Sequence, residues 1–166
     1  MSAEIHRITE ADIPGYHACL DVVARERRYL AFLSAPPLEQ TRTWVLPHIE
    51  KNHPFYVAAV EGHVVGWCDI SLQEREGFTH RGAIGMGVLP DFRGRGIGHR
   101  LLRASVDHAH QLGIERIELE VFVSNQPAIH LYESFGFAVE GTLRHGRKLD
   151  GKYDDVLAMA LITDFK

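Results

Sequence analysis

The chain carries RGRGIG at residues 93–98 and NQPAIHLYESFGF at residues 125–137, and these two segments are its most informative sequence. The first stands between an apolar, β-rich run and a run with helical spacing of its apolar residues. Glycines in such a turn let the backbone approach a ligand closely, and the first helical turn presents free N–H groups there. With the helix dipole added, residues 93–98 are predicted to bind phosphate groups. The alternative at this point is an ordinary glycine-rich turn with its arginines in solvent.

Two common phosphate loops do not match this turn. The dinucleotide-binding pattern would place a third glycine at position 99, where the chain has His99. A Walker loop would end in Gly-Lys-Ser or Gly-Lys-Thr, and no such tripeptide occurs in the sequence. The sequence therefore excludes both a Rossmann and a P-loop reading of residues 93–98.

Outward from this turn, hydrophobic periodicity and breakers predict a mixed order of elements. Helices are expected at residues 9–28, 38–51, 96–112 and 125–135. Strands are expected at residues 4–8, 55–61, 63–72, 80–89, 114–123, 137–148 and 152–162. This order predicts an α+β fold, a three-layer arrangement in which helices cover both faces of one sheet.

Composition places the chain among ordinary globular proteins. It has 166 residues, 45% hydrophobic and 24% charged, so we expect a single domain over residues 1–166. A net charge of −4 disfavours a nucleic-acid binder. No apolar run approaches the ~18 residues of a membrane span, and MSAEIHRITEAD lacks the features of a secretory signal. The two cysteines cannot form a disulfide framework. We expect a soluble, cytoplasmic protein that binds neither nucleic acid nor membrane.

Read together, the two segments resemble a known family. The pattern R-x-x-G-x-G at residues 93–98, followed by N-x-x-A-x-x-x-Y-x-x-x-G-F at residues 125–137, resembles the GCN5-related N-acetyltransferase (GNAT) family. The segment SNQPAIHLYESFGF looks most similar to bacterial acetyltransferases of amino acids and phosphinothricin-like amines. The resemblance implies a mixed, largely antiparallel sheet with helices on both faces. It also implies acetyl-CoA as cosubstrate.

The resemblance assigns roles to particular positions. Backbone groups at the end of the strand before the turn would pair with the pantetheine amides, at Met86, Gly87 and Val88. Gly85 and Gly87 fit this role, because glycine weakens a strand unless something must come close. Backbone N–H groups of the turn would hold the pyrophosphate, at Arg93, Gly94, Arg95, Gly96, Ile97 and Gly98.

The second segment implies two further site residues. Asn125 would hydrogen-bond the cofactor arm, and a plain helix N-cap is the alternative. Tyr132 would lie near the thioester sulfur as general acid for the leaving thiolate, either by a strengthening hydrogen bond or through a lowered phenol pKa. The alternative for Tyr132 is an aromatic residue that only packs in the core.

Acetyl transfer to an amine also needs a neutral amine. A lysine-like amine, with a pKa of about 10.4, costs roughly 4.6 kcal/mol to deprotonate at pH 7, and an α-amino group near 7.8 costs about 1 kcal/mol. Some family members carry a glutamate on the strand before the turn, but residues 81–86 read RGAIGM. Asp69, Glu118, Glu120 or a water chain remain candidates for the general base.

The sequence contains no motif typical of a metal site or of a serine hydrolase. The 11 histidines include no His-x-x-x-His or His-Glu-x-x-His pair, so we expect no metal site. No Gly-x-Ser-x-Gly elbow is present, which argues against a serine hydrolase.

These observations favour an enzyme that moves an acetyl group from acetyl-CoA to a primary amine of a small molecule. A protein N-terminal or lysine acetyltransferase is the second reading, and a non-catalytic acyl-CoA sensor is the third, against which Tyr132 argues. Acceptor choice is expected to depend on Tyr29, Phe32, Trp44 and residues 67–78, although aromatic residues there equally fit a core.

The last predicted strand also bears on assembly. It carries apolar residues that the core explains first, and chains of this family that end in a hairpin often associate through their C-terminal strands. A homodimer is therefore expected, with the apolar material supplied by Val156, Leu157, Met159 and Leu161.

Overall fold

A computed structural model describes residues 2–165 and contains one seven-stranded sheet in the order β1-β2-β3-β4-β5-β7-β6. The strands are β1 (Glu4–Arg7), β2 (Phe55–Val60), β3 (His63–Leu72), β4 (Arg81–Val88), β5 (Arg116–Phe122), β6 (Ala138–Leu149) and β7 (Lys152–Ile162). The helices are α1 (Ile13–Arg25), α2 (Leu38–Glu50), α3 (Ile97–Gln111) and α4 (Gln126–Ser134), with short 3₁₀ turns η1 (Glu10–Asp12) and η2 (Pro90–Phe92).

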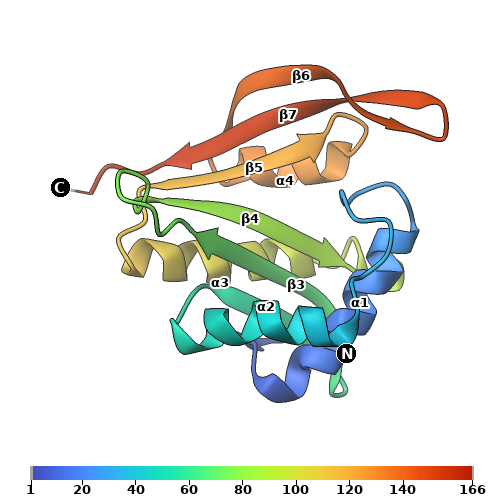
Figure 1. Ribbon diagram of the computed structural model, residues 1–166, viewed down its shortest axis with the longest axis vertical. Coiled ribbons are helices and arrows are strands. Elements are labelled where there is room, and N and C mark those ends of the chain that lie inside the picture. Colours follow the sequence, from blue (N-terminus) through green and yellow to red (C-terminus); the bar gives the residue numbers. More distant parts are fainter. Residues whose placement is uncertain (1, 166) are drawn as a thin grey trace.

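The sheet is antiparallel at every neighbouring pair except β4–β5, which confirms the mixed, largely antiparallel expectation. Within residues 2–165, β4 and β5 pair only where Arg81–Ala83 meet Arg116–Glu118. Beyond Ala83 the two strands diverge, as the ribbon shows between the green and orange parts of the sheet (Figure 1). Backbone groups of β4 that point towards β5 in this stretch are left without a strand partner.

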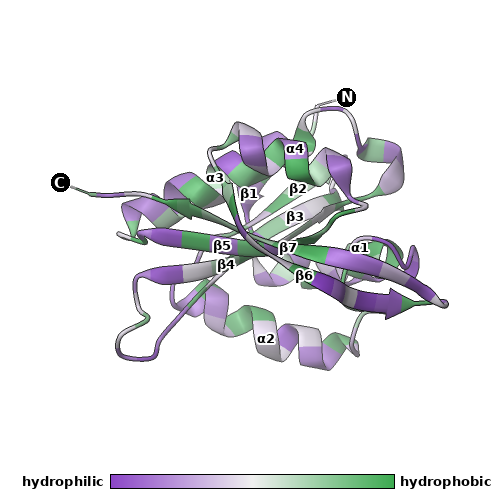
Figure 2. Cartoon of the chain, turned by 90° about the horizontal axis from the view of Figure 1, so that it is seen from above, coloured by the Kyte–Doolittle hydropathy of each residue, from purple (hydrophilic) through white to green (hydrophobic). Residues whose placement is uncertain are grey.

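Helices cover both faces of the sheet, as expected, and each face has its own apolar cluster. Helices α3 and α4 pack on one face, where the buried core includes Leu101, Leu102, Ile117 and Met159. Helices α1 and α2 pack on the other, against Phe55 and Trp67 among others. Along α3 and α4, hydrophobic and hydrophilic residues alternate, while the turn end of the β6–β7 hairpin is largely hydrophilic (Figure 2).

The predicted boundaries hold to within a few residues, and the differences have local causes. Helix α1 ends at Arg25 rather than near residue 28, because Arg27 adopts a left-handed conformation with φ of 58°. Helix α3 ends at Gln111, one residue before the predicted end, and Leu112 at its C-cap is 40% exposed. Val123 is likewise exposed, because β5 ends one residue earlier.

None of the helices in residues 2–165 is both long and apolar enough to cross a membrane. Cys19 and Cys68 are buried free thiols.

Candidate active site

A cavity of about 670 Å³ opens where β4 and β5 diverge, and we call it the central cavity. Its walls come from β4 and β5, from the starts of α3 and α4, and from the loop after α1. Residues contributed by these elements include Ile84, Gly85, Met86, Gly87, Val88, Gly96, Gly98, Glu120, Phe122, Asn125 and Tyr132. The predicted segments 84–98 and 125–137 therefore meet around one space.

The glycines of β4 are explained by the neighbouring strand rather than by a ligand. An added Cβ at Gly87 would lie 2.4 Å from the ring of Trp67, and one at Gly85 would lie 3.0 Å from Asp69 Oδ1. The close approach predicted at these positions is therefore real, but it is made by two β3 side chains on the α1/α2 face. Met86, Gly87 and Val88 still line the central cavity beside the open edge of β4.

The turn at residues 93–98 has the backbone geometry of an anion-binding loop. Gly94 and Gly96 adopt left-handed conformations with φ of 73° and 78°, and α3 begins at Ile97. The N–H of Arg100 donates to Gly96 O (3.1 Å), so the N–H groups just before it have no acceptor within the helix. The cavity-lining residues of this turn are Arg93, Gly94, Gly96, Ile97 and Gly98.

Arg93 and Arg95 were both expected to offer backbone N–H groups to the pyrophosphate, and their surroundings in the structure are less favourable for this. The guanidinium of Arg95 is 5.3 Å from the ring centre of Phe92, and Arg95 does not line the central cavity. The backbone N–H of Arg93 already donates to Pro90 O (3.3 Å), so the N–H groups free to bind an anion would be those that follow it.

The side chain of Arg93 instead bonds to Glu26 at the end of α1 and to Val88, and we call this set of contacts the Arg93 clasp. Its guanidinium donates to both carboxylate oxygens of Glu26 (2.9 and 2.5 Å), while Nε donates to Val88 O (2.8 Å). The same guanidinium lies 4.7 Å from the ring centre of Tyr29. Sequence reasoning missed this contact, because its two charged partners are 67 residues apart and follow no local pattern.

Removing the clasp should destabilise the protein. We expect Arg93→Met to lower the free energy of unfolding by about 1.5–3 kcal/mol, because it leaves the half-buried Glu26 carboxylate unpaired. Arg25→Met is the matched control, since Arg25 forms a surface pair with Asp21 that contributes about 0–1 kcal/mol. Urea denaturation checks both variants. Equal losses in the two would contradict the structural role of Arg93.

Tyr132 lies on α4 with its ring in the core and also lines the central cavity. It is 7% exposed, and its ring centre is 5.8 Å from that of Phe137. Burial, and secondarily the thiol of Cys68, raise the pKa of Tyr132 above its ordinary value. A lowered phenol pKa is therefore the wrong alternative. Burial therefore favours the protonated hydroxyl, which can donate a hydrogen bond.

Asn125 caps its helix, as one of its two predicted alternatives requires, and it lies where the other alternative would place it. Its Oδ1 accepts a hydrogen bond from the N–H of Ala128 (3.4 Å), which caps α4. The residue also lines the central cavity. The side-chain amide N–H₂ is the group left to donate to a ligand.

The three candidate carboxylates have different surroundings. Burial tends to raise the pKa of Glu118, but hydrogen bonds from Arg81 and Arg116 outweigh it and lower that pKa overall. Glu120 lines the central cavity and is exposed, and within residues 2–165 it has no ion-pair partner inside 4.0 Å. Asp69 is 5% exposed behind Gly85.

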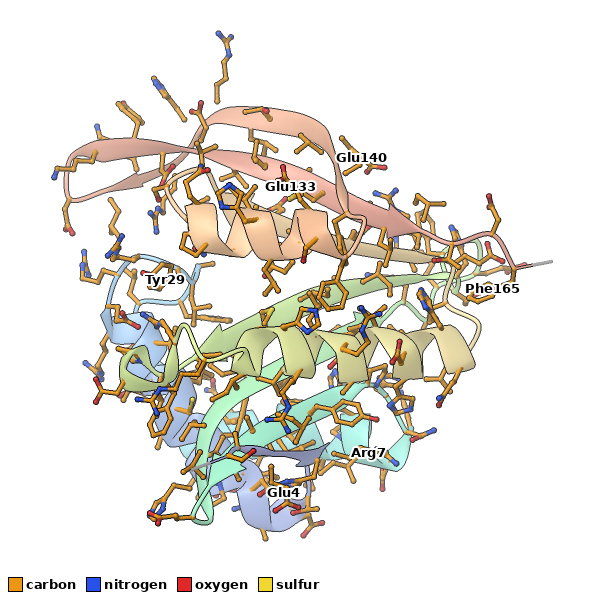
Figure 3. All side chains as sticks on the ribbon, turned by 180° about the vertical axis from the view of Figure 1, so that it is seen from behind. Glu4, Arg7, Tyr29, Glu133, Glu140 and Phe165 are labelled. Carbon is orange, nitrogen blue, oxygen red and sulfur yellow. The ribbon has the colours of Figure 1, made fainter. Side chains whose placement is uncertain are left out.

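Of the aromatic residues expected near the acceptor, Tyr29 and Phe32 line the central cavity. Tyr29 lies on the loop between α1 and α2 (Figure 3), which contacts the β6–β7 hairpin through hydrogen bonds from Arg27 to Asp150. Trp67 is buried at 2% exposure, so this residue belongs to the core. Trp44 and Phe78 do not line the cavity. Among residues 2–165, no group of three or more His, Cys, Asp or Glu side chains could hold a metal ion.

Comparisons with known proteins agree with this geometry. Residues 18–137 match the model of the acetyltransferase (GNAT) family. The chain is 32% identical over 160 residues to an L-amino acid N-acetyltransferase of Escherichia coli K12, covering 93% of this chain and 96% of that protein. It is 27% identical over 122 residues to an L-amino acid N-acyltransferase of the same organism, covering 73% and 71%.

Solved structures show the same fold. A GNAT-family acetyltransferase of Streptococcus pneumoniae superposes with a TM-score of 0.90 at 25% identity, covering 96% of this chain and 99% of that one. A phosphinothricin acetyltransferase of Sinorhizobium meliloti, solved with acetyl-CoA, superposes with a TM-score of 0.90 at 20% identity, covering 98% and 89%. The divergent strands, the glycine turn and the tyrosine helix define an acyl-CoA-dependent acetyltransferase. This chain belongs to the GNAT family.

Proposed function

We propose that this protein moves the acetyl group of acetyl-CoA to the primary amine of an amino acid or a related small amine. The observation that carries the proposal is the meeting of three groups in the central cavity: the N–H groups at the start of α3, the Tyr132 hydroxyl and the Glu120 carboxylate. The first suits a pyrophosphate, the second a leaving sulfur and the third an incoming ammonium group. The chain would act as a single acetyltransferase domain.

The residues of the cavity divide the chemistry among them. Glu120 holds the acceptor as its ammonium form near the divergence of β4 and β5. After one proton is lost, the amine nitrogen forms a bond to the acetyl carbonyl carbon, and the bond from that carbon to sulfur breaks. Tyr132 donates a hydrogen bond to the sulfur as negative charge develops on it. The second proton of the nitrogen ends on the departing thiolate, which gives the free thiol.

The size of the cavity and the names of two relatives both support a small acceptor. Two E. coli relatives act on L-amino acids by name, and the chain covers more than two thirds of each. A cavity of about 670 Å³ must hold the pantetheine end of acetyl-CoA as well, and Tyr29 and Phe32 are among the residues that line it. The room left suits an amino acid better than a folded protein surface.

A thiol-release assay tests this proposal. The protein, acetyl-CoA and a thiol reagent are incubated in turn with each amino acid, with polyamines and with short peptides. We expect the highest kcat/KM among amino acids and related small amines. Turnover only with peptides would favour the second reading, and acetyl-CoA binding without any turnover would favour the sensor.

A peptide N-terminus is the second candidate acceptor. Its α-amino group has the same low deprotonation cost as that of a free amino acid, and the chain is 38% identical over 105 residues to an N-alpha-acetyltransferase of Sulfurisphaera tokodaii, covering 63% of that protein. The same assay separates the two acceptors, because the α-carboxyl group beside the reacting amine is free in an amino acid and part of an amide bond in a peptide.

The proposal includes a homodimer joined at the β6–β7 hairpin. Val156 and Met159 of β7 lie in the core, but β6 is the edge strand and leaves Val139 and Leu143 each 48% exposed. An unpaired edge with apolar side chains is a surface that a second copy can cover. We expect light scattering to report twice the 18.7 kDa chain mass at micromolar concentration, and Leu143→Lys to shift it to the monomer. A monomer in the wild type would remove this element of the proposal.

We also propose a cytoplasmic location, because acetyl-CoA is made and used inside cells, together with action on small molecules rather than on nucleic acid or membrane.

A further inference from the structure

The carboxylate of Asp69 lies directly behind the wall of the central cavity. Asp69 on β3 is paired in register with Gly85 on β4, and Gly85 lines the cavity. An added Cβ on Gly85 would lie 3.0 Å from Oδ1 and 3.6 Å from Oδ2 of Asp69. Because a side chain at position 85 would press on this carboxylate, only the backbone of Gly85 separates Asp69 from the cavity at this point.

A chain of polar atoms leads from Asp69 towards the surface. Ser71 Oγ lies 3.5 Å from Asp69 Oδ2 and 3.5 Å from His48 Nε2. His48 belongs to α2 and is half-buried, whereas Asp69 is 5% exposed. The three residues come from one strand and the helix packed over it, and they connect the cavity wall to solvent.

The hydrogen bonds of His48 determine which way a proton can move along this chain. Its Nδ1 lies 2.8 Å from the carbonyl oxygen of Trp44, which can only accept, so Nδ1 carries the proton in the neutral ring. Nε2 is then an acceptor facing Ser71. The one hydroxyl proton of Ser71 thus lies between two acceptors, Asp69 and His48. When Asp69 gains a proton, Ser71 can accept from it and donate to His48.

We propose that Asp69 is the general base that takes the proton of the acceptor amine, and that Ser71 and His48 relay this proton to solvent. The inference rests on the proposed function. The acceptor ammonium loses one proton to Asp69, through a water molecule in the cavity where the amine does not reach the carboxylate. Its lone pair then forms the N–C bond as the C–S bond breaks. The proton leaves Asp69 for Ser71, Ser71 gives its own proton to His48, and His48 releases one to bulk water.

The other two carboxylates suit this task less well. Glu118 accepts hydrogen bonds from Arg81 and Arg116, which hold it in its ionised form as part of the sheet structure. Glu120 is exposed in the cavity, where it can hold an ammonium group, but among residues 2–165 its carboxylate has no ion-pair partner that could take a proton onward. Burial raises the pKa of Asp69 to about 7, near the optimum for a base that works at neutral pH.

The groups that face Asp69 do not themselves change charge near pH 7, so the ionisation expected in this pH range is that of Asp69. Burial keeps both Tyr16 of α1 and Cys68 of β3 neutral, by raising their pKa values. Gly85 of β4 and Phe55 of β2, which is paired with Asp69, do not titrate. Burial lowers the pKa of His48, beside which lie His53, Lys51 and Glu74. A protonated His48 therefore gives up its proton readily.

The pH dependence of kcat/KM tests the base. In the wild type, kcat/KM should rise with pH as Asp69 ionises, with a limb near pH 7. Asp69→Asn should lower kcat/KM at pH 7 by about 10²-fold for a polyamine and by less for an α-amine. The limb should move up to the pKa of the amine, so that activity recovers in alkaline buffer. The acetyl-CoA affinity should not change.

The relay is tested by buffer rescue. Ser71→Ala and His48→Gln should each lower kcat by about 10-fold in dilute buffer, and added imidazole should restore most of the loss by carrying the proton itself. His53→Gln is the control, since His53 neighbours His48 but lies outside the chain of polar atoms. A purely structural role of His48 predicts a loss that imidazole does not repair.

The outcomes separate this inference from the proposed function. If the wild type acetylates no amine, the proposed function fails. If it does, and Asp69→Asn keeps the wild-type pH profile, Asp69 is not the base. Should Asp69→Asn not fold, as thermal denaturation would show, the rescue experiment on Ser71→Ala and His48→Gln decides, and losses that imidazole leaves unchanged overturn the proposal.

Discussion

Tyr132→Phe should reduce kcat by about 10²–10⁴-fold while leaving the affinity for acetyl-CoA nearly unchanged. The phenylalanine ring keeps the packing against Phe137 and the core, so only the hydroxyl is lost. That hydroxyl is the group we assign to the leaving sulfur. Its contribution is made as charge develops, so its loss appears in kcat rather than in binding.

The raised pKa of Tyr132 specifies how the hydroxyl acts. A thiol has a pKa near 8.5 and a free phenol near 10, so full proton transfer to the thiolate would be uphill by roughly 2 kcal/mol even without burial. Burial raises the pKa of this phenol further. Hydrogen-bond donation is therefore the only effective contribution, and kcat should show no limb from ionisation of Tyr132 in the neutral range.

Tyr153→Phe is the matched control for this experiment. Tyr153 on β7 is 54% exposed and stacks on His145, away from the central cavity, so its variant should retain wild-type kcat. Stopped-flow measurements establish whether chemistry limits the rate. Near-wild-type kcat in Tyr132→Phe, with chemistry limiting, would mean that Tyr132 only packs. A sensor would show no turnover in either form and would still bind acetyl-CoA.

Gly96→Val should weaken acetyl-CoA binding by about 10²-fold. Gly96 has a φ of 78°, a conformation that costs an L-residue roughly 1–2 kcal/mol and a β-branched residue more. An added Cβ meets nothing within 4 Å, so the substituent would stand in open space directly before the first turn of α3. Both the strained turn and the side chain should interfere with a bound pyrophosphate.

Gly113→Val separates this binding defect from a loss of stability. Gly113 follows the other end of α3 with nearly the same conformation, φ of 79°, and an added Cβ there also meets nothing within 4 Å. The two variants should lose comparable thermal stability, but only Gly96→Val should lose affinity in calorimetry. Unchanged affinity in folded Gly96→Val would count decisively against the phosphate-loop assignment.

Residues 93–98 and 125–137 show which features of the site can be predicted from a few neighbouring residues. Left-handed glycines and free N–H groups at a helix start follow from chain geometry over a few residues, so the turn and its ligand chemistry were predictable. The N-cap at Asn125 and the helix that carries Tyr132 were predictable for the same reason. The divergence of β4 from β5 was not, because it depends on two strands and the helix between them.

Local periodicity and turn chemistry by themselves determined the order of elements, the mixed sheet and the family, since these depend on neighbours along the chain. Tertiary structure alone decided the partners of charged residues. It paired Arg93 with Glu26, left Glu120 open to the cavity and placed Asp69 behind Gly85, next to Ser71 and His48. Burial and the distance to an opposite charge set the state of a carboxylate, and both arise only when distant segments pack together.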